Sequence, residues 1–457
     1  MSMEIAVSEE KENRMTEHIV EAKCGKIKGY QENNVYIYRG IPYAKTERFE
    51  LPKAYAWEGE FDATVGETDC FQYSTFLDES KAKDNFYYDE FRSGREFSYA
   101  EDFMTLNIVA PVEAKNMPVL IFIHGGGHET GTVGEMPYGL CTEYAKRGIV
   151  FVSIGYRLNV FSLYDGRNFG LHDQIAATKW VYENIEAFGG DPSKITLMGQ
   201  SAGAMSITDL MYCDKLKCVV QGVILMSGGG MIPKLAGPWT REQAKPFWNE
   251  IRRRAGVENE EEAKTVDAEC LWKAWYEVSR ESKGFQAIQP SIDGEIITDV
   301  PQEVFKAGKE LDVPVMLGVT SQDFLSVILY EVGLNWGITN AKKNKQPVYA
   351  YMFDRTPPGN RFKAFHACDL WYMFGCMEQS WRPFEKVDEE LASLMQDYVA
   401  NFVKTCNPNG AGLPEWQPLS KKHKGFRLFD GKSKGVMKPL KCRYKVLKTM
   451  LWDKGPM

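Results

Sequence analysis

Short apolar runs alternate with longer, helix-like segments between about residue 117 and residue 228, and this alternation constrains the fold more than any other feature. The apolar runs are continuous, without a polar residue at every second position, so we expect strands that are buried on both faces of a sheet. Strands separated by helices predict a mostly parallel sheet with helices on both sides, which is the α/β class. The runs are "VLIFI" (119–123), "IVFVSIGYRL" (149–158), "ITLM" (195–198) and "GVILMS" (222–227), and the longest helix-like segment is "LHDQIAATKWVYENIEAF" (171–188).

Beyond this region the alternation stops and then resumes. Residues 240–285 are charged and helix-like, and we interpret about 232–300 as a helical insertion packed above the sheet. Strand-like runs return at 313–320 and 347–353, and an amphipathic helix is expected at 388–406. A chain of 457 residues exceeds the roughly 250–300 residues that one hydrophobic core usually holds. The sequence therefore requires either two domains or one large domain with insertions.

The composition excludes several functional classes. A net charge of -7 gives no reason to expect nucleic acid or an anionic membrane as a partner. No apolar run approaches the roughly 20 residues of a membrane-spanning helix, and residues 1–18, which we expect to form a flexible polar tail, lack the apolar core of a signal peptide. The ten cysteines show no C-x-x-C spacing and there is no H-E-x-x-H motif, so neither a disulfide framework nor a metal site is expected. These features favour a cytoplasmic protein.

A basic stretch near the C-terminus departs from this acidic balance. We favour a solvated surface, or a face packed on the acidic body, over a binding site for a polyanion, because few aromatic residues are interleaved with the charges. The stretch includes Lys421, Lys422, Lys424, Lys441, Arg443 and Lys445.

Ser201 lies between two glycines directly after the apolar run 195–198, in "GQSAG", and the residues that follow are helix-like. A G-x-S-x-G pentapeptide alone is a weak signal, because a glycine-rich turn can contain it by chance. A serine on a sharp turn from strand to helix needs small neighbours that clash with neither element, and glycine meets that need. We therefore interpret Ser201 as a nucleophile placed on such a turn.

A serine hydroxyl becomes a good nucleophile when a base removes its proton, and the base is usually a histidine oriented by a carboxylate. With this kind of turn the chain order is serine, acid, histidine, which leaves His366 and His423 as candidates. We favour His366, because it lies in a loop with apolar neighbours after the run 347–353. His423 lies in "KKHKG", which reads as an exposed basic loop.

The acid is expected at the carboxyl end of a strand, where the reacting groups of an open α/β sheet gather. Asp323, directly after the run 313–320, meets this condition. Asp293 and Glu295 are the alternatives, although Asp293 followed by glycine more simply forms a turn.

Three consecutive glycines follow the first apolar run, in "IHGGGHETG" (123–131). A bare backbone lets N–H groups approach a substrate closely, so this loop can supply donors to the oxyanion that forms during ester cleavage. The N–H group of Ala202, directly after the serine, would be its partner.

With these motifs in place, the chain from about residue 20 onward resembles the type-B carboxylesterase and cholinesterase family of α/β-hydrolases. It is similar in particular to the shorter, para-nitrobenzyl-esterase-like bacterial members. Further matching segments are "YRGIPYA" (38–44), "EDFMTLNIVAP" (101–111), "GYRLN" (155–159), "NFGLHDQIAATKWVYENIEAFGGDP" (168–192), "SGG" (227–229), "DLWYMFG" (369–375) and "NPNG" (407–410).

The resemblance implies one α/β-hydrolase domain over residues 19–457 and a serine esterase that cleaves short-chain or aryl carboxylic esters through an acyl-enzyme, without metal or organic cofactor. Its implied catalytic groups are Ser201 as nucleophile, Asp323 as acid, His366 as base, and Gly126, Gly127 and Ala202 as oxyanion donors. Ser227 matches a serine that lies near these groups in relatives, which implies a supporting role.

The chain departs from the family pattern at three positions. Gln200 stands where animal relatives have glutamate, and the acid Asp323 is one methylene shorter than the glutamate of many members. Phe103 stands where secreted members have a cysteine that pairs with the one matching Cys70, so that disulfide cannot form here. Its absence supports a reducing compartment.

Two other functions remain as alternatives. The family includes binding proteins that keep the fold without catalysis, but they lose the serine or the histidine, and this chain has both. Amide cleavage or lipolysis by the same groups is the second alternative, although the insertion is charged, whereas lipases usually expose an apolar cap. Trp336 and Trp371 allow an aromatic-lined pocket, but we expect most such residues to lie in the core.

Overall fold

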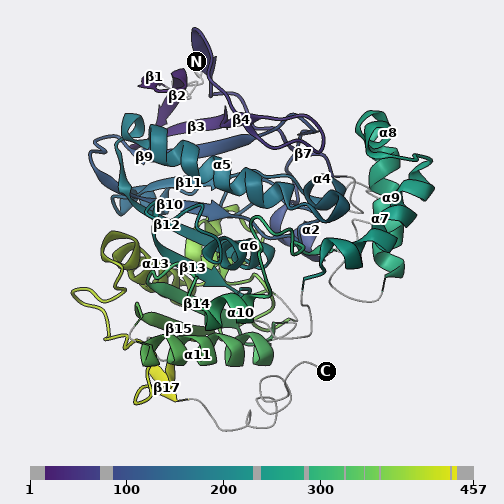
Figure 1. Cartoon of the computed structure of the whole chain (residues 1–457). Helices are drawn as coiled ribbons and strands as arrows, with labels where there is room; N and C mark the ends of the chain where they lie inside the picture. Colours follow the sequence, from purple (N-terminus) through teal and green to yellow (C-terminus); the bar gives the residue numbers. More distant parts are fainter. Residues whose placement is uncertain are drawn as a thin grey trace, which may run out of the picture.

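The computed structural model describes residues 16–72, 86–229, 238–282, 288–323, 326–343, 345–359, 362–432 and 435–439. Within these ranges a 13-stranded sheet runs through the molecule with helices on both faces (Figure 1). Its strand order is β1-β2-β3-β9-β11-β10-β12-β13-β14-β15-β16-β17, with β6 beside β2. Two small sheets pair β4 (Ala44–Lys45) with β5 (Lys53–Ala54) and β7 (Asp69–Cys70) with β8 (Tyr99–Ala100).

The centre of the large sheet is parallel, and its two ends are antiparallel. Neighbouring strands from β11 through β16 in this order run in the same direction, and every residue of β11 and β14 is buried. The α/β class predicted from the continuous apolar runs is confirmed. The strands are β1 (Thr16–Ala22), β2 (Gly25–Glu32), β3 (Val35–Pro42), β6 (Glu60–Asp62), β9 (Thr105–Pro111), β10 (Met117–Ile123), β11 (Val150–Ile154), β12 (Gly190–Gln200), β13 (Val220–Met226), β14 (Val315–Thr320), β15 (Val348–Phe353), β16 (Gly425–Phe429) and β17 (Met437–Pro439).

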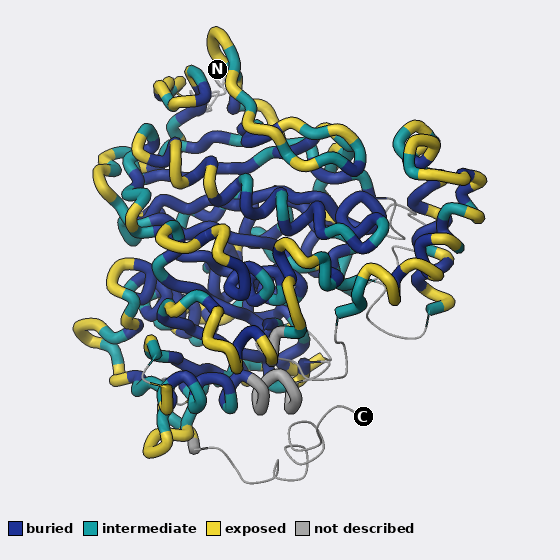
Figure 2. The backbone as a smooth tube through the Cα atoms, viewed as in Figure 1, coloured by how far each residue is buried: buried dark blue, intermediate teal, exposed yellow. Residues whose placement is uncertain are grey.

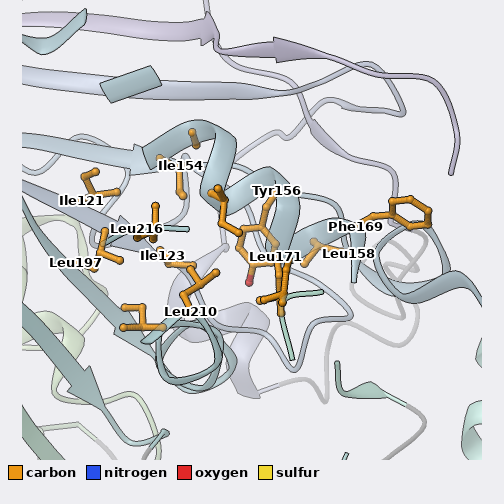
Figure 3. Packing of buried hydrophobic residues seen from close by; sticks show 14 of the residues in the cluster. Ile121, Ile123, Ile154, Tyr156, Leu158, Phe169, Leu171, Leu197, Leu210 and Leu216 are labelled. Atoms are coloured by element: carbon orange, nitrogen blue, oxygen red, sulfur yellow. The ribbon is translucent and has the colours of Figure 1, made fainter. Parts of the chain in front are cut away.

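Helices cover both faces because successive side chains of a strand point to opposite sides. In β10, Ile121 and Ile123 belong to one apolar cluster, whereas Phe122 belongs to the other. The first cluster includes residues of α5 (Phe169–Asn184), α6 (Ala202–Met211) and α11 (Ser326–Lys342), and Figure 3 shows Leu171 of α5 and Leu210 of α6 within it. The second includes residues of α3 (Glu143–Lys146), α12 (Leu370–Phe374) and α13 (Lys386–Thr405).

Shorter helices complete this part of the chain. They are α2 (Phe86–Phe91), α4 (Asn159–Leu163), α10 (Pro301–Lys306) and the 3-10 turn η2 (Ile185–Phe188), which extends α5. In the ranges that the structure describes, no helix combines the length and apolar character needed to cross a membrane.

Two element boundaries differ from the sequence prediction. The apolar run 149–158 is a strand only to Ile154, because Tyr156 turns its hydroxyl to donate to the carbonyl of His124, at 2.8 Å, and stays buried outside the sheet. At the N-terminus, residues 16–18 of the expected flexible tail belong to β1, which pairs with β2. His18 is held there by the hydroxyl of Tyr38, 2.6 Å from its Nδ1. Residues 1–15 lie outside the described residues.

The described part of the expected insertion has its helices between residues 241 and 281, whereas residues 289–300 form no helix. It contains α7 (Arg241–Ala255), α8 (Glu260–Thr265) and α9 (Ala268–Glu281), which together we call the cap. Figure 1 shows the cap beyond one end of the sheet, and Figure 2 shows its outer side exposed. This end is the carboxyl end of the parallel strands, since Arg280 of α9 forms a salt bridge with Glu129 in the loop after β10.

A buried ion pair joins the end of β11 to α5. The guanidinium of Arg157 donates to both carboxylate oxygens of Asp173, at 2.8 and 2.7 Å, and the backbone N–H of Arg157 donates to the same carboxylate at 3.0 Å. The two side chains are only 3% and 0% exposed. Removing one partner would leave the other charge buried without compensation.

We expect Asp173→Asn to lower the free energy of unfolding by about 3–5 kcal/mol, because the guanidinium of Arg157 would stay buried without its counter-charge. Denaturant unfolding of the purified chain measures this loss. Glu269→Gln is the matched control, since it breaks an exposed pair with Lys273 and should cost less than about 1 kcal/mol. Equal effects of the two substitutions would contradict the structural role of the buried pair.

Candidate active site

Ser201 occupies a sharp turn between β12 and α6. Its backbone has φ 54° and ψ −122°, a conformation that a serine keeps only when its surroundings enforce it. A Cβ added to Gly199 would lie 2.6 Å from the carbonyl carbon of Gly203, and one added to Gly203 would lie 2.1 Å from the carbonyl oxygen of Ile123. Strand, turn and helix therefore follow in the predicted order, and both glycines are needed because backbone packs directly against them.

His366 and Asp323 meet although 43 residues separate them along the chain. Nδ1 of His366 lies 2.8 Å from Oδ2 of Asp323, and the two side chains are 13% and 2% exposed. Asp323 follows β14, and its Oδ2 also accepts a hydrogen bond from the hydroxyl of Thr320, at 3.2 Å. Thr320, the last residue of β14, thus holds the carboxylate in place.

The other ring nitrogen of His366 lies at the serine turn. Its Nε2 is 3.2 Å from the side-chain amide nitrogen of Gln200, the residue before Ser201. Because the carboxylate of Asp323 can only accept, Nδ1 carries the proton and Nε2 presents its lone pair. This is the tautomer that a base needs in order to take a proton from a serine hydroxyl.

Ser227 connects to the carboxylate through Thr320. The Ser227 hydroxyl accepts from the backbone N–H of Thr320 at 3.4 Å, and the Thr320 hydroxyl donates to Asp323. A Cβ on the next residue, Gly228, would lie 2.2 Å from the carbonyl oxygen of Ser201. The end of β13 therefore packs on the serine turn, and Ser227 acts on Asp323 only through an intermediate residue.

The glycine loop after β10 lies against the same turn. A Cβ on Gly125 would lie 3.0 Å from Cβ of Ser201, and Gly126 has φ 100° with the carbonyl oxygen of Thr130 only 2.0 Å from the position of its missing Cβ. Gly127 also has a positive φ, 68°. In the described part of the chain, no acceptor is bonded to the backbone N–H of Gly126, Gly127 or Ala202.

The alternative residues lie in other settings. Asp293 accepts hydrogen bonds from three successive backbone N–H groups, those of Glu295, Ile296 and Ile297. It therefore forms the turn that the sequence suggested for it. His423 is exposed, and the contacts recorded for it are with Ser420.

The two tryptophans considered as pocket residues are core residues. Trp336 and Trp371 are both fully buried. Of the residues named for the basic stretch, Lys421, Lys422 and Lys424 are exposed, whereas Lys441, Arg443 and Lys445 lie outside the described residues. No group of three or more histidine, cysteine, aspartate or glutamate side chains among the described residues could hold a metal ion.

Sequence reasoning missed Thr320, the contact of Gln200 with His366, and Asp369. Asp369 is fully buried; its Oδ2 accepts from the hydroxyl of Tyr351 at 3.1 Å, and its Oδ1 has no partner among the described residues. Burial raises its pKa to about 7, and the charge of Asp323 adds to this effect. The position of Asp369 three residues after His366 was the only available signal.

We expect Gly203→Ala to cost about 1–3 kcal/mol of stability or more, because the new methyl group would overlap the carbonyl oxygen of Ile123. The variant should also lose the ester hydrolysis expected from the sequence, since the overlap displaces the serine turn. Thermal unfolding and ester hydrolysis measure the two effects. Gly66→Ala is the control, because only the flexible end of Arg39 lies near its Cβ position, at 3.3 Å. An active, stable Gly203→Ala variant would disprove the close packing.

We expect Asp369→Asn to stabilise the protein at pH 8 more than at pH 5. The folded pKa, about 7, is above the unfolded value of 3.8, so the folded state binds the extra proton, and stability falls as the pH rises between those values. Asparagine is neutral at every pH, so the variant does not lose folding stability in this way as the pH rises. Thermal unfolding at several pH values tests it, and a pH-independent difference between the two proteins would contradict the raised pKa.

Comparison with known proteins places this site in a family. A family model described as "Carboxylesterase family" matches residues 16–333 and 322–445. Para-nitrobenzyl esterase of Bacillus subtilis is 31% identical to the chain, over 86% of this chain and 91% of that protein. Cocaine esterase of Homo sapiens is 26% identical, over 84% of this chain and 81% of that protein.

Solved structures agree. A para-nitrobenzyl esterase structure superposes with a TM-score of 0.80 at 26% identity, covering 96% of this chain and all of the other (100%). A Geobacillus stearothermophilus carboxylesterase gives a TM-score of 0.78 at 26% identity, over 95% of this chain and 99% of the other. The serine turn, the glycine loop and the parallel sheet that carries them are therefore those of an α/β-hydrolase, and the chain belongs to the carboxylesterase family of carboxylic ester hydrolases.

Proposed function

We propose that the chain hydrolyses carboxylic esters with Ser201 as nucleophile, His366 as general base and acid, and Asp323 as the carboxylate that orients the histidine. The observation that carries this proposal is the position of the imidazole. One ring nitrogen is 2.8 Å from Asp323 and the other is 3.2 Å from the residue before Ser201. The base therefore lies between its carboxylate and the serine turn.

In the first half of the reaction, His366 takes the proton of Ser201 while the hydroxyl oxygen attacks the ester carbonyl. Asp323 remains ionised and stabilises the imidazolium that forms. The oxyanion binds the backbone N–H groups of Gly126, Gly127 and Ala202. His366 then gives its proton to the departing alcohol, which leaves an acyl group on the serine.

In the second half, His366 takes a proton from water, and the hydroxide attacks the acyl group. The same N–H groups bind the second oxyanion, and Ser201 leaves with the proton returned by His366. The two halves use the same donors, and the chain's own residues supply every group that these steps require.

Short-chain or aryl esters are the substrates that we infer. The name of the relative from Bacillus subtilis, para-nitrobenzyl esterase, refers to an aromatic ester. The outer side of the cap is exposed and carries many charged residues, such as Glu260, Glu261 and Glu262 at the start of α8, which does not favour long apolar acyl chains. Short-chain or aryl esters are thus preferred over the long-chain lipid esters that a lipase hydrolyses.

A reducing compartment such as the cytoplasm is the location that we propose. The nine cysteines of the described ranges are all free, including buried Cys70. Phe103 lies buried where a disulfide partner would stand in secreted relatives, and the Cys70 thiol instead accepts from the backbone N–H of Leu158 at 3.3 Å. Free buried thiols suit a reducing environment.

We expect Ser201→Ala to lower kcat for p-nitrophenyl esters by about four to six orders of magnitude, because the acyl-enzyme cannot form. A series of p-nitrophenyl esters of increasing acyl length gives the chain-length preference, and a fluorophosphonate probe should label the wild type but not the variant. Ser162→Ala is a control, since this serine lies buried away from the turn in α4.

The three outcomes separate the alternatives. Labelling with turnover supports the proposal, and labelling without turnover of these esters points to another acyl substrate, such as an amide. Neither labelling nor turnover by the wild type would overturn the proposal in favour of a binding module.

A further inference from the structure

The cap is joined to the glycine loop by a two-point ion pair. The guanidinium of Arg280, near the end of α9, donates to both carboxylate oxygens of Glu129, at 2.9 and 2.5 Å. The Glu129 side chain is only 16% exposed, and Arg280 also lies over the ring of Tyr276, 4.6 Å from its centroid. A planar guanidinium bound at two points has a defined geometry, unlike most ion pairs at a protein surface.

Glu129 in turn fixes the peptide group that presents an oxyanion donor. Its backbone N–H donates to the carbonyl of Gly126 at 3.0 Å, and that of Thr130 donates to the same carbonyl at 3.1 Å. The carbonyl of Gly126 and the N–H of Gly127 belong to one planar trans peptide, so they point in opposite directions. The backbone N–H groups of Glu129 and Thr130 hold the carbonyl of Gly126 inside the turn 126–130, and the N–H of Gly127 therefore points away from that turn.

A second contact links the same loop to the chain that returns from the cap. Nδ1 of His128 lies 3.2 Å from the carbonyl oxygen of Ile288, and its Nε2 lies 3.0 Å from the hydroxyl of Ser206 in α6. A carbonyl only accepts, so Nδ1 donates to Ile288 and Nε2 accepts from Ser206. Burial lowers the pKa of His128 to about 4, which keeps the ring neutral near pH 7.

The successive residues His128 and Glu129 of the glycine loop thus contact two separate parts of the insertion, the segment at Ile288 and the helix α9. His128 also anchors the loop to α6, the helix whose first turn carries Ala202. His128 thereby connects the glycine loop to α6, and these are the two segments to which we assign the oxyanion donors. Glu129 connects the same loop to α9.

We propose that Glu129 and His128 are positioning residues through which the cap sets the geometry of the oxyanion loop, with the Arg280–Glu129 pair as the link that transmits the position of α9. This inference rests on the proposed function, because it assigns the N–H of Gly127 to the oxyanion. A cap displaced from the loop would leave the serine and histidine in place but weaken the binding of the transition state.

The first test is a double-mutant cycle with Glu129→Gln, Arg280→Gln and the combined variant, assayed with p-nitrophenyl acetate. Each single change should lower kcat and kcat/KM by the same factor, about three- to thirty-fold, with KM unchanged, because oxyanion contacts form only in the transition state. The combined variant should be no slower than either single one, since both remove the same link.

Arg254→Gln is the matched control. Arg254 of α7 makes a similar two-point pair with Glu281, but within the cap, so its loss should leave kcat unchanged. Thermal unfolding of all variants checks that the fold persists. His128→Phe removes both imidazole contacts and should lower kcat in the same way; if this buried change prevents folding, Ser206→Ala removes the contact to α6 alone.

The results separate this inference from the proposed function. Loss of turnover in Ser201→Ala with full activity in Glu129→Gln and Arg280→Gln would overturn the inference and leave the proposed function intact. Additive losses in the combined variant, or a change confined to KM, would also overturn it. Turnover that persists in Ser201→Ala would overturn the proposed function itself.

Discussion

The approach of β12 and α6 to within backbone contact is the constraint on which the rest of the site depends. Side chains at positions 199 and 203 would collide with backbone atoms of the turn and of β10. With glycine at both positions, the chain reverses within one residue, and Ser201 takes a positive φ that the surrounding backbone holds, partly through the Ser201 N–H, which donates to the carbonyl of Met226 at 2.8 Å. Ser201 is therefore held at the edge of the sheet by contacts of the main chain around it.

The remaining groups reach Ser201 because parallel strands place their carboxyl ends along one edge. The loops after β10, β14 and β15 carry the glycines, Asp323 and His366 in turn. Polar contacts then orient individual groups, as when the hydroxyl of Thr320 donates to Asp323 at 3.2 Å. The insertion joins the same edge through the salt bridge between Arg280 and Glu129, which connects the cap to the glycine loop after β10. The sheet determines where the groups meet, and polar side chains determine their orientation.

The sequence predicted those features whose signal is local. Continuous apolar runs identified β10, β12, β13, β14 and β15. The apolar neighbours of His366 favoured it over His423, and its place after a strand favoured Asp323 over Asp293 and Glu295. Features that depend on tertiary contact were not predictable. The segment after Ile154 leaves the sheet but still carries Tyr156 and Leu158, which are buried, since burial in the core requires the same apolar residues as a buried strand. Glu129 and Arg280 lie 151 residues apart, and nothing in either segment indicates that they pair.

The neutral amide of Gln200 beside the imidazole has a consequence for charge during turnover. A carboxamide offers a donor on one side and an acceptor on the other, and half a rotation about its last torsion exchanges them. The group that donates to the basic ring can thus accept from the same ring once it is protonated, whereas a carboxylate can only accept. The side chain of Gln200 is therefore a dipole whose direction can reverse when the imidazole of His366 gains or loses a proton.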